Sequence, residues 1–96
     1  IPTQGLLELG KVGTYGANKY GLFNYSKGHK SSQLVSACLR HLIGEEGNPG
    51  YQMGSDYDKE SGLLHLSHLA FTVLMLIQQH HDGTIDDDRP KRIKHD

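Results

Sequence analysis

The chain has 96 residues, and its ten lysines and arginines nearly balance its eleven aspartates and glutamates, to a formal net charge of −1. Balanced charge provides no global field for nucleic acid or an anionic membrane, so we expect neither as a partner. The single cysteine, Cys38, excludes an intramolecular disulfide and a zinc site built from several cysteines.

The first expected helix runs from about Gln4 to Asn18, where leucine, valine and tyrosine side chains recur at three- and four-residue spacings. Glycines interrupt this pattern, and each costs about 1 kcal/mol relative to alanine inside a helix. The interrupting residues are Gly5, Gly10, Gly13 and Gly16. These glycines either let another part of the backbone approach the helix closely or leave the segment partly irregular. Residues 19–30 then form a loop rich in glycine and tyrosine.

A second helix is expected to begin at Ser31 or Ser32, which are both good N-cap residues, and to end near Gly44 or Gly47. Apolar residues recur every three or four positions along it, and Cys38 lies in one of these rows. Cys38 therefore looks like a small core residue, because an apolar setting disfavours the reactive thiolate.

The third expected helix runs from about Lys59 to His81, with Asp58 or Ser61 as its cap. Residues 63–77 are apolar on nearly every side, which predicts a central helix packed on several faces. As a helix this run spans about 22 Å, too short for a hydrocarbon core of about 30 Å. A domain this small buries only about 60–65% of its unfolded surface, so we expect a second copy to cover the helix in a homo-oligomer.

No segment shows the alternation of a β-strand, so the expected fold is all-α, with three helices and glycine-rich loops in one domain over residues 1–81. Residues 82–96 form a charged tail that we expect to be extended or disordered. Its charges predict a solvated surface and no site: Asp86, Asp87, Asp88, Arg89, Lys91, Arg92 and Lys94. The first ten residues lack the pattern of a signal peptide, which favours a cytoplasmic location.

A candidate ligand-binding segment lies between the first two expected helices. It carries five polar or aromatic residues: Lys19, Tyr20, Asn24, Tyr25 and Lys27. Lysines neutralise phosphate oxygens, tyrosine rings stack on bases, and nearby glycines let a ligand approach the backbone. The alternative is a plain connection whose aromatic rings close the edge of the core. No Walker A or GxGxxG motif decides between the two.

Histidines and acidic residues form a second candidate cluster. Its members come from the ends of the second and third expected helices: Arg40, His41, Asp58, Glu60, His65 and His68. They would meet if these two helices are antiparallel. Imidazole together with carboxylate suits zinc, manganese or iron, whereas carboxylates alone suit magnesium. The alternative is a set of structural histidines satisfied by neighbouring polar groups.

Three stretches of the chain carry a family resemblance. They are residues 16–21 (GANKYG) with Asn24, Tyr25 and Gly28, then residues 40–42 (RHL), then residues 58–62 (DKESG) with residues 65–68 (HLSH). In order and spacing they resemble the N-terminal domain of phage-type dATP/dGTP diphosphohydrolases, over about residues 5–80. The resemblance implies a small helical domain of phage nucleotide metabolism in the host cytoplasm. It also implies that the 19–28 loop and Arg40 touch a nucleotide, and that the second cluster holds the family's polar positions.

The related MazG-like pyrophosphohydrolases hold magnesium with an ExxE motif and a later ExxD motif. Neither motif is intact in this chain, since Glu45 is followed three residues later by Asn48, Glu46 by Pro49 and Glu60 by Leu63. Metal-assisted attack of water on a phosphoanhydride needs carboxylates that fix a cation. The departure from the motif therefore favours binding over turnover.

The leading hypothesis is a homo-oligomer that binds a phosphorylated purine nucleotide without turnover, including sequestration of a host cyclic nucleotide signal as an anti-defence function. Phosphates would meet Lys19, Lys27 and Arg40, beside His41, and the base or sugar would meet Tyr20, Asn24 and Tyr25. The alternative is a pyrophosphohydrolase that releases dNMP and pyrophosphate with magnesium or manganese. Its cation would lie among Asp58, Glu60, His65 and His68. A third hypothesis is a helical assembly module without a ligand.

Overall fold

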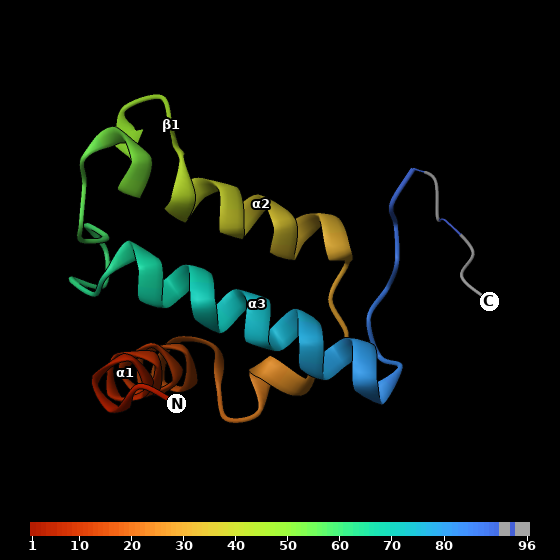
Figure 1. The fold of residues 1–96 in the computed structure, drawn as a ribbon. Coiled ribbons are helices and arrows are strands. Elements are labelled where there is room, and N and C mark those ends of the chain that lie inside the picture. Colours follow the sequence, from red (N-terminus) through yellow and green to blue (C-terminus); the bar gives the residue numbers. More distant parts are fainter. Residues whose placement is uncertain (91–92, 94–96) are drawn as a thin grey trace.

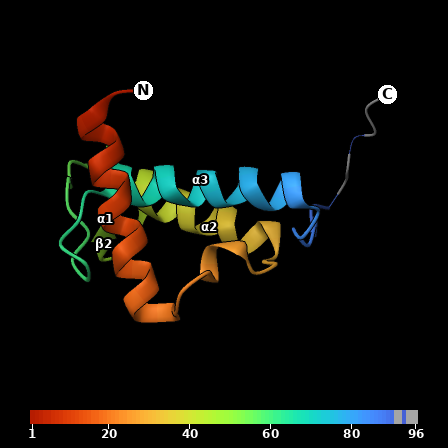
Figure 2. The same cartoon turned by 90° about the horizontal axis from the view of Figure 1, so that it is seen from below.

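The structure is a computed structural model that describes residues 1–90 and residue 93. It contains the α-helices α1 (Thr3–Tyr20), α2 (Ser31–Leu42) and α3 (His65–Asp82), the 3-10 helices η1 (Asn24–Ser26) and η2 (Tyr51–Met53), and the strands β1 (Gly44–Glu45) and β2 (Asn48–Pro49). Helix α3 lies between the other two: α2 runs antiparallel along it, and α1 crosses it steeply (Figures 1 and 2). The expected central position of the third helix is confirmed.

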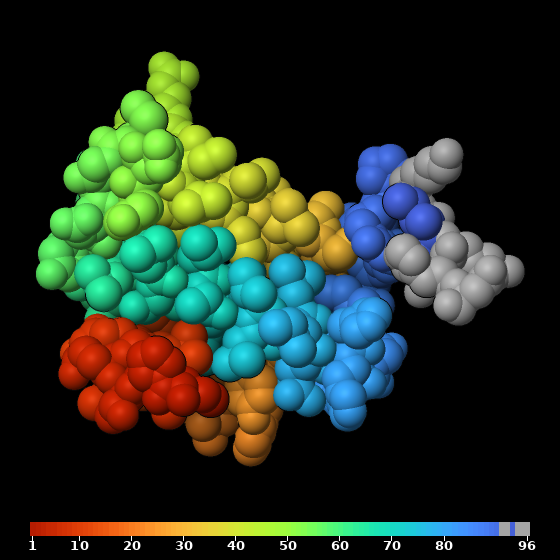
Figure 3. Space-filling view, viewed as in Figure 1, coloured from red at the N-terminus to blue at the C-terminus, as the bar shows by residue number. Residues whose placement is uncertain are grey.

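The all-α expectation is wrong, because a small antiparallel hairpin follows α2. Gly44 pairs with Pro49, and Glu45 pairs with Asn48. The chain reverses because Gly44 and Gly47 adopt φ values of +106° and +75°, which glycine reaches without the steric strain of a side chain. Two-residue strands are too short to show alternation in a sequence, so the hairpin leaves no periodic signal. Its tip projects from the body of the molecule (Figure 3).

Helix α3 begins at His65 and not at Lys59, because the preceding residues close a turn. The Asp58 amide donates a hydrogen bond to the Leu63 carbonyl at 2.8 Å, and Gly62 adopts a φ of +72°. The Ser61 amide donates to the Asp58 carboxylate at 2.8 Å. Asp58 and Ser61 therefore stabilise this turn and do not cap α3, contrary to expectation.

Helix α1 continues to Tyr20, two residues past the expected Asn18, so Lys19 and Tyr20 are helical and not in a loop. One of its glycines has a packing role: a Cβ on Gly13 would lie 3.2 Å from the Phe71 ring of α3. The helix therefore approaches α3 closely at this position, which was one of the two expected explanations for the glycines.

Residues 84–88 pack against the N-terminus of α2, contrary to the expectation of a solvated tail (Figure 3). The Asp86 carbonyl accepts a hydrogen bond from the Ser31 amide at 2.9 Å, and the Asp88 carboxylate accepts from the Ser32 amide and the Ser31 hydroxyl, both at 2.8 Å. Helix α2 begins at Ser31 as expected, but its first turn is capped by a distant carboxylate. The expected tail charges of Lys91, Arg92 and Lys94 lie outside the described residues.

The interior contains few apolar and several polar side chains. Among the described residues, the buried apolar ones are Val12 and Leu34, whereas Gln79 is completely buried. The Gln79 side chain accepts a hydrogen bond from the His29 amide at 3.0 Å and donates to the Tyr25 carbonyl at 3.0 Å and to His29 Nδ1 at 2.9 Å. These bonds fasten the loop between α1 and α2 to the central helix. None of the helices described is both long and apolar enough to cross a membrane.

Candidate functional site

A cleft of about 1090 Å³ lies between α1, the loop after it, α2 and α3. Most of the residues expected at a site line it: Lys19, Tyr20, Asn24, Tyr25, Arg40, His41, Asp58, Glu60, His65 and His68. Lys27 is exposed and lies outside this lining. The antiparallel packing of α2 on α3, together with the packing of α1 and η1 on α3, brings together two clusters that the sequence separates by up to 49 positions, from Lys19 to His68. A cleft of this volume is at the upper end for small-molecule sites.

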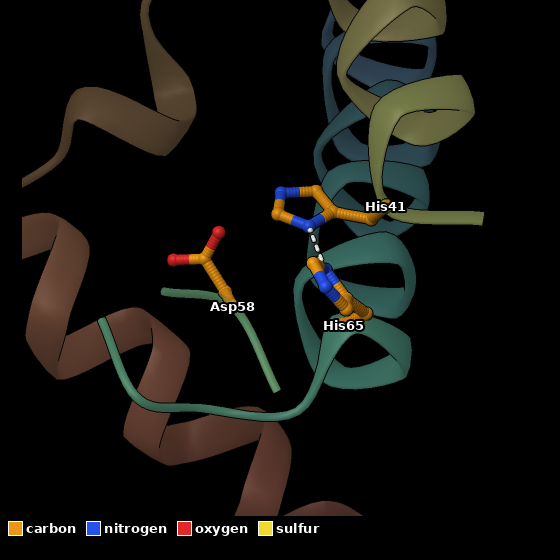
Figure 4. A group of neighbouring side chains, drawn as sticks. All are labelled: His41, Asp58 and His65. Carbon is orange, nitrogen blue, oxygen red and sulfur yellow. Dashed lines mark hydrogen bonds between the residues drawn. The ribbon is translucent and has the colours of Figure 1, made fainter. Parts of the chain in front are cut away.

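Three imidazoles meet at one end of the cleft. His41 Nδ1 lies 3.0 Å from His65 Nδ1, so one of these two nitrogens carries the proton of a hydrogen bond (Figure 4). The His41 ring stacks on the His68 ring, with centroids 4.5 Å apart and planes 6° from parallel. His65 is buried, and its Nε2 lies 3.3 Å from the Ser55 hydroxyl. The expected meeting of these histidines is confirmed.

Asp58 and His68 share a serine partner. The Ser61 hydroxyl lies 2.7 Å from His68 Nε2, and the Ser61 amide donates to the Asp58 carboxylate, which lies 4.0 Å from His68 Nε2. Burial raises the pKa of Asp58, but the hydrogen bonds from Ser61 and the nearby imidazoles outweigh it and bring the pKa below its ordinary value. Asp58 is therefore a carboxylate at neutral pH.

The two stacked histidines are neutral at physiological pH. Burial, with a smaller contribution from the adjacent His68, lowers the pKa of His41 to about 4, whereas Asp58 acts in the opposite direction. Burial also lowers the pKa of His68, against the attraction of Asp58. Both rings consequently retain a nitrogen lone pair that can accept a proton or bind a metal ion.

Lys19 and Glu60 form an ion pair at the rim of the cleft. The Glu60 hydrogen bond raises the pKa of Lys19, and the Lys19 hydrogen bond lowers the pKa of Glu60. The Lys19 ammonium also lies 5.1 Å from the centre of the Tyr20 ring. Because exposed ion pairs contribute little to stability, an incoming anion can separate this one.

The tightest group of potential metal ligands differs from the expected one. One ligand atom from each of His41, Asp58 and His65 lies within 4.8 Å of the others (Figure 4). The structure brings His41 into this group, whereas Glu60 is paired with Lys19 and His68 with Ser61. A cation bound here would lie near the N-terminus of α3, where the helix dipole would disfavour its binding by only about 0.3–1 kcal/mol.

The cleft carries a slight excess of negative charge. Its lining contains two cationic side chains, Lys19 and Arg40, against three carboxylates, Glu45, Asp58 and Glu60. Within residues 1–90 the Arg40 side chain makes no ion pair or hydrogen bond that the structure describes, so its guanidinium is available. A polyphosphate that entered this cleft without a cation would meet this excess of negative charge.

Two polar residues that support the site were not predicted from the sequence: Ser55, next to His65, and Gln79, next to His29. Ser55 lies in the segment after η2, and no local pattern marks it. Gln79 lies two helical turns after Thr72, on the same face of α3 as His65, His68 and Thr72, so this polar face offered a signal. His65, His68 and Thr72 line the cleft, and Gln79 secures the loop that forms another of its walls.

The comparison with protein families confirms the resemblance seen in the sequence. The model of the family described as dATP/dGTP diphosphohydrolase, N-terminal, matches residues 1–89, and the chain belongs to this family. No curated protein and no solved structure matches the chain significantly.

Proposed function

We propose that the chain binds a phosphorylated purine nucleotide in the cleft between α1, α2 and α3. The observation that carries the proposal is the convergence of unlike groups on one cavity. Arg40 and Lys19 supply positive charge for phosphates, and the Tyr20 and Tyr25 rings supply stacking surfaces for a base. Asn24, between the tyrosines, offers an amide to the base or sugar.

A divalent cation accompanies the nucleotide in this proposal. Two cationic side chains cannot neutralise a triphosphate and the three carboxylates of the cleft together. A bound cation would reverse the excess of negative charge, and magnesium or manganese commonly enters such sites with the phosphates. Nucleotide affinity should therefore rise when a divalent cation is present.

Hydrolysis of the nucleotide to dNMP and pyrophosphate is the second candidate function. Membership of a family described as diphosphohydrolase favours it, and so does the presence of Asp58, His41 and His65 in the same cleft. A cation held there would polarise the phosphoanhydride and activate water. The absence of the paired carboxylate motifs of the MazG-like enzymes argues against hydrolysis. We therefore prefer the hypothesis that the chain binds a nucleotide without turnover, including a cyclic nucleotide signal.

Calorimetric titration with a panel of linear and cyclic, purine and pyrimidine nucleotides tests binding, with and without magnesium or manganese. Separation of the products after incubation tests turnover. Binding with full recovery of the nucleotide supports capture, and release of dNMP and pyrophosphate supports the enzyme. If no nucleotide produced heat, both nucleotide binding and hydrolysis would be contradicted. The remaining hypothesis would be a helical assembly module without a ligand.

Two lysines on α1 provide a matched pair for locating the phosphates. Lys19 and Lys11 are both exposed and each pairs with a glutamate, but only Lys19 lines the cleft. Lys19→Ala should weaken nucleotide binding about tenfold through loss of a charge-assisted hydrogen bond, whereas Lys11→Ala should leave the affinity unchanged. If the two variants bound the nucleotide with equal affinity, Lys19 would not be a phosphate contact.

We also propose that the protein acts as a homo-oligomer in the cytoplasm of a phage-infected cell. Helix α3 has a stripe of partly exposed apolar residues at helical spacing: Leu66, Val73, Leu74 and Ile77, with exposed fractions of 41–61%. A second copy of the chain would remove this surface from water. Sedimentation analysis tests the assembly, and an Ile77→Asp variant that sediments like the original protein would exclude this stripe as the interface.

A further inference from the structure

We propose that His41, Asp58 and His65 form a resident site for a divalent transition-metal ion of the zinc class. The three residues come from three separate parts of the fold: the last turn of α2, the turn before α3, and the first residue of α3. Their ligand atoms lie within 4.8 Å of one another at one end of the cleft. The site is built from this chain alone and does not depend on the nucleotide.

The spacing of the two imidazoles fits ligation of a single ion. His41 Nδ1 and His65 Nδ1 are 3.0 Å apart. Two nitrogens that each lie about 2.0–2.1 Å from one zinc ion are separated by about 2.8–3.4 Å, for N–Zn–N angles between 90° and the tetrahedral angle. The two rings therefore need to part by a few tenths of an ångström at most. The Asp58 ligand atom, which lies within 4.8 Å of the histidine ligand atoms, has to approach them to reach the same ion.

Neighbouring groups hold each of the three ligands in position. The Ser55 hydroxyl, 3.3 Å from His65 Nε2, can accept a hydrogen bond from a protonated Nε2, which leaves the Nδ1 lone pair of this tautomer free for the metal. The His68 ring stacks on His41, and the Ser61 amide donates to Asp58. Such outer contacts commonly orient metal ligands and raise their affinity.

The chemistry of the ligands selects the ion. Two imidazole nitrogens with one carboxylate suit zinc, cobalt or iron, whereas magnesium prefers an octahedron of oxygen atoms. Within the described residues the group supplies three ligands, and it faces the cleft, so further positions can be filled by water or a phosphate oxygen. Zinc should bind more tightly than manganese, and manganese more tightly than magnesium.

Titration of the whole chain with Zn²⁺ and Co²⁺, in the absence of nucleotide, tests the site. We expect one tightly bound ion per chain by calorimetry, visible absorption bands on addition of Co²⁺, and loss of these bands when Zn²⁺ is added. An equal concentration of Mg²⁺ should leave the Co²⁺ spectrum unchanged. Because no nucleotide is present, failure of the proposed function would not affect this result.

Three variants assign the ligands. His41→Gln and Asp58→Asn should each weaken Zn²⁺ binding at least about tenfold, and Asn at position 58 can still accept the Ser61 hydrogen bond that supports the turn. His81→Gln removes a highly exposed histidine of α3 outside the cluster and should leave affinity and spectrum unchanged. Thermal melting of each variant confirms that it is folded.

Three results would overturn the proposal. The first is a folded Asp58→Asn or His41→Gln variant that binds Zn²⁺ as tightly as the original chain. The second is the loss of tight binding in His81→Gln, which would move the ion to surface histidines. Failure of the original chain to bind Zn²⁺ or Co²⁺ at all would exclude the site directly.

Discussion

Replacing Gln79 with alanine should destabilise the protein far more than the same replacement at the adjacent Gln78. Gln79 is completely buried and makes three hydrogen bonds to the loop between α1 and α2, two of them to backbone groups. Gln78 is exposed, and among the described residues its side chain bonds only to Asp82, one helical turn away. The two residues are chemically identical and lie on the same helix, so they isolate the effect of the buried contacts.

The expected magnitude follows from these bonds. A typical hydrogen bond contributes about 0.5–1.5 kcal/mol, and a buried partner that is left unpaired costs about 1–3 kcal/mol. Since the loop is partly exposed and water can replace some partners, we expect a loss of about 2–4 kcal/mol for Gln79→Ala. A helix-surface pair such as Gln78 and Asp82 contributes about 0.2–0.5 kcal/mol. For a domain of this size, 1 kcal/mol shifts the Tm by about 4–8 °C.

Urea unfolding and thermal melting followed by circular dichroism measure the two variants. Gln79→Ala should lower the Tm by about 8–30 °C at an unchanged m-value, whereas Gln78→Ala should shift it by no more than about 4 °C. Hydrogen exchange of the 24–29 amides should accelerate in the first variant alone. If the two variants melted within 2 °C of each other, about the scatter of such a measurement, the assignment of Gln79 as the anchor of the loop would be refuted.

Three further outcomes are expected. The hydrogen bonds from Ser32 hold the pKa of Asp88 at about 2, below its value in the unfolded chain, so its contribution is complete above about pH 4 and is lost as the pH falls toward 2. Unfolding measured against pH should show Asp88→Asn less stable than the original at pH 7, with the difference closing at low pH; a constant difference would contradict the capping role. Gly44→Ala should destabilise much more than Gly47→Ala, since both have positive φ but only at Gly44 would a Cβ meet backbone, 2.3 Å from the Gly50 nitrogen; equal midpoints in urea would refute this. Burial raises the pKa of the Cys38 thiol, so it should react with a disulfide reagent more slowly at pH 7 than the same thiol in urea, and an equal rate would show that it is open to solvent.

The sequence predicted the helices well where apolar periodicity is unbroken. The start of α2 at Ser31 and the central position of α3 follow from patterns that depend on nearby residues. The late start of α3 could not be predicted in this way, because residues 59–61 are acceptable in a helix and are diverted by the hydrogen bonds of Asp58 and the positive φ of Gly62. Conformations decided by contacts beyond the local segment leave little trace in periodicity.

The site was predicted in outline and revised in detail. The spacing of His65 and His68 on one face of α3, opposite His41, indicated where the imidazoles would meet, and the structure confirms that meeting. The membership of the tight ligand group differs because Lys19 attracts Glu60 away from it, a contact across 41 positions that no local pattern reveals. The sequence indicated which polar residues lie in the cleft, but the pairing of their side chains across the cleft could be seen only in the structure.

The bond between Asp88 and the first turn of α2 joins residues 57 positions apart and so bears on the order in which the protein folds. Contacts of high sequence separation form slowly, because the intervening chain must first be ordered enough to bring its ends together. During synthesis, Ser31 and Ser32 leave the ribosome long before their capping carboxylate exists. The N-terminal turn of α2 should therefore remain frayed until α3 has docked and residues 84–88 have returned to it, which makes the closing of this turn one of the last steps in folding.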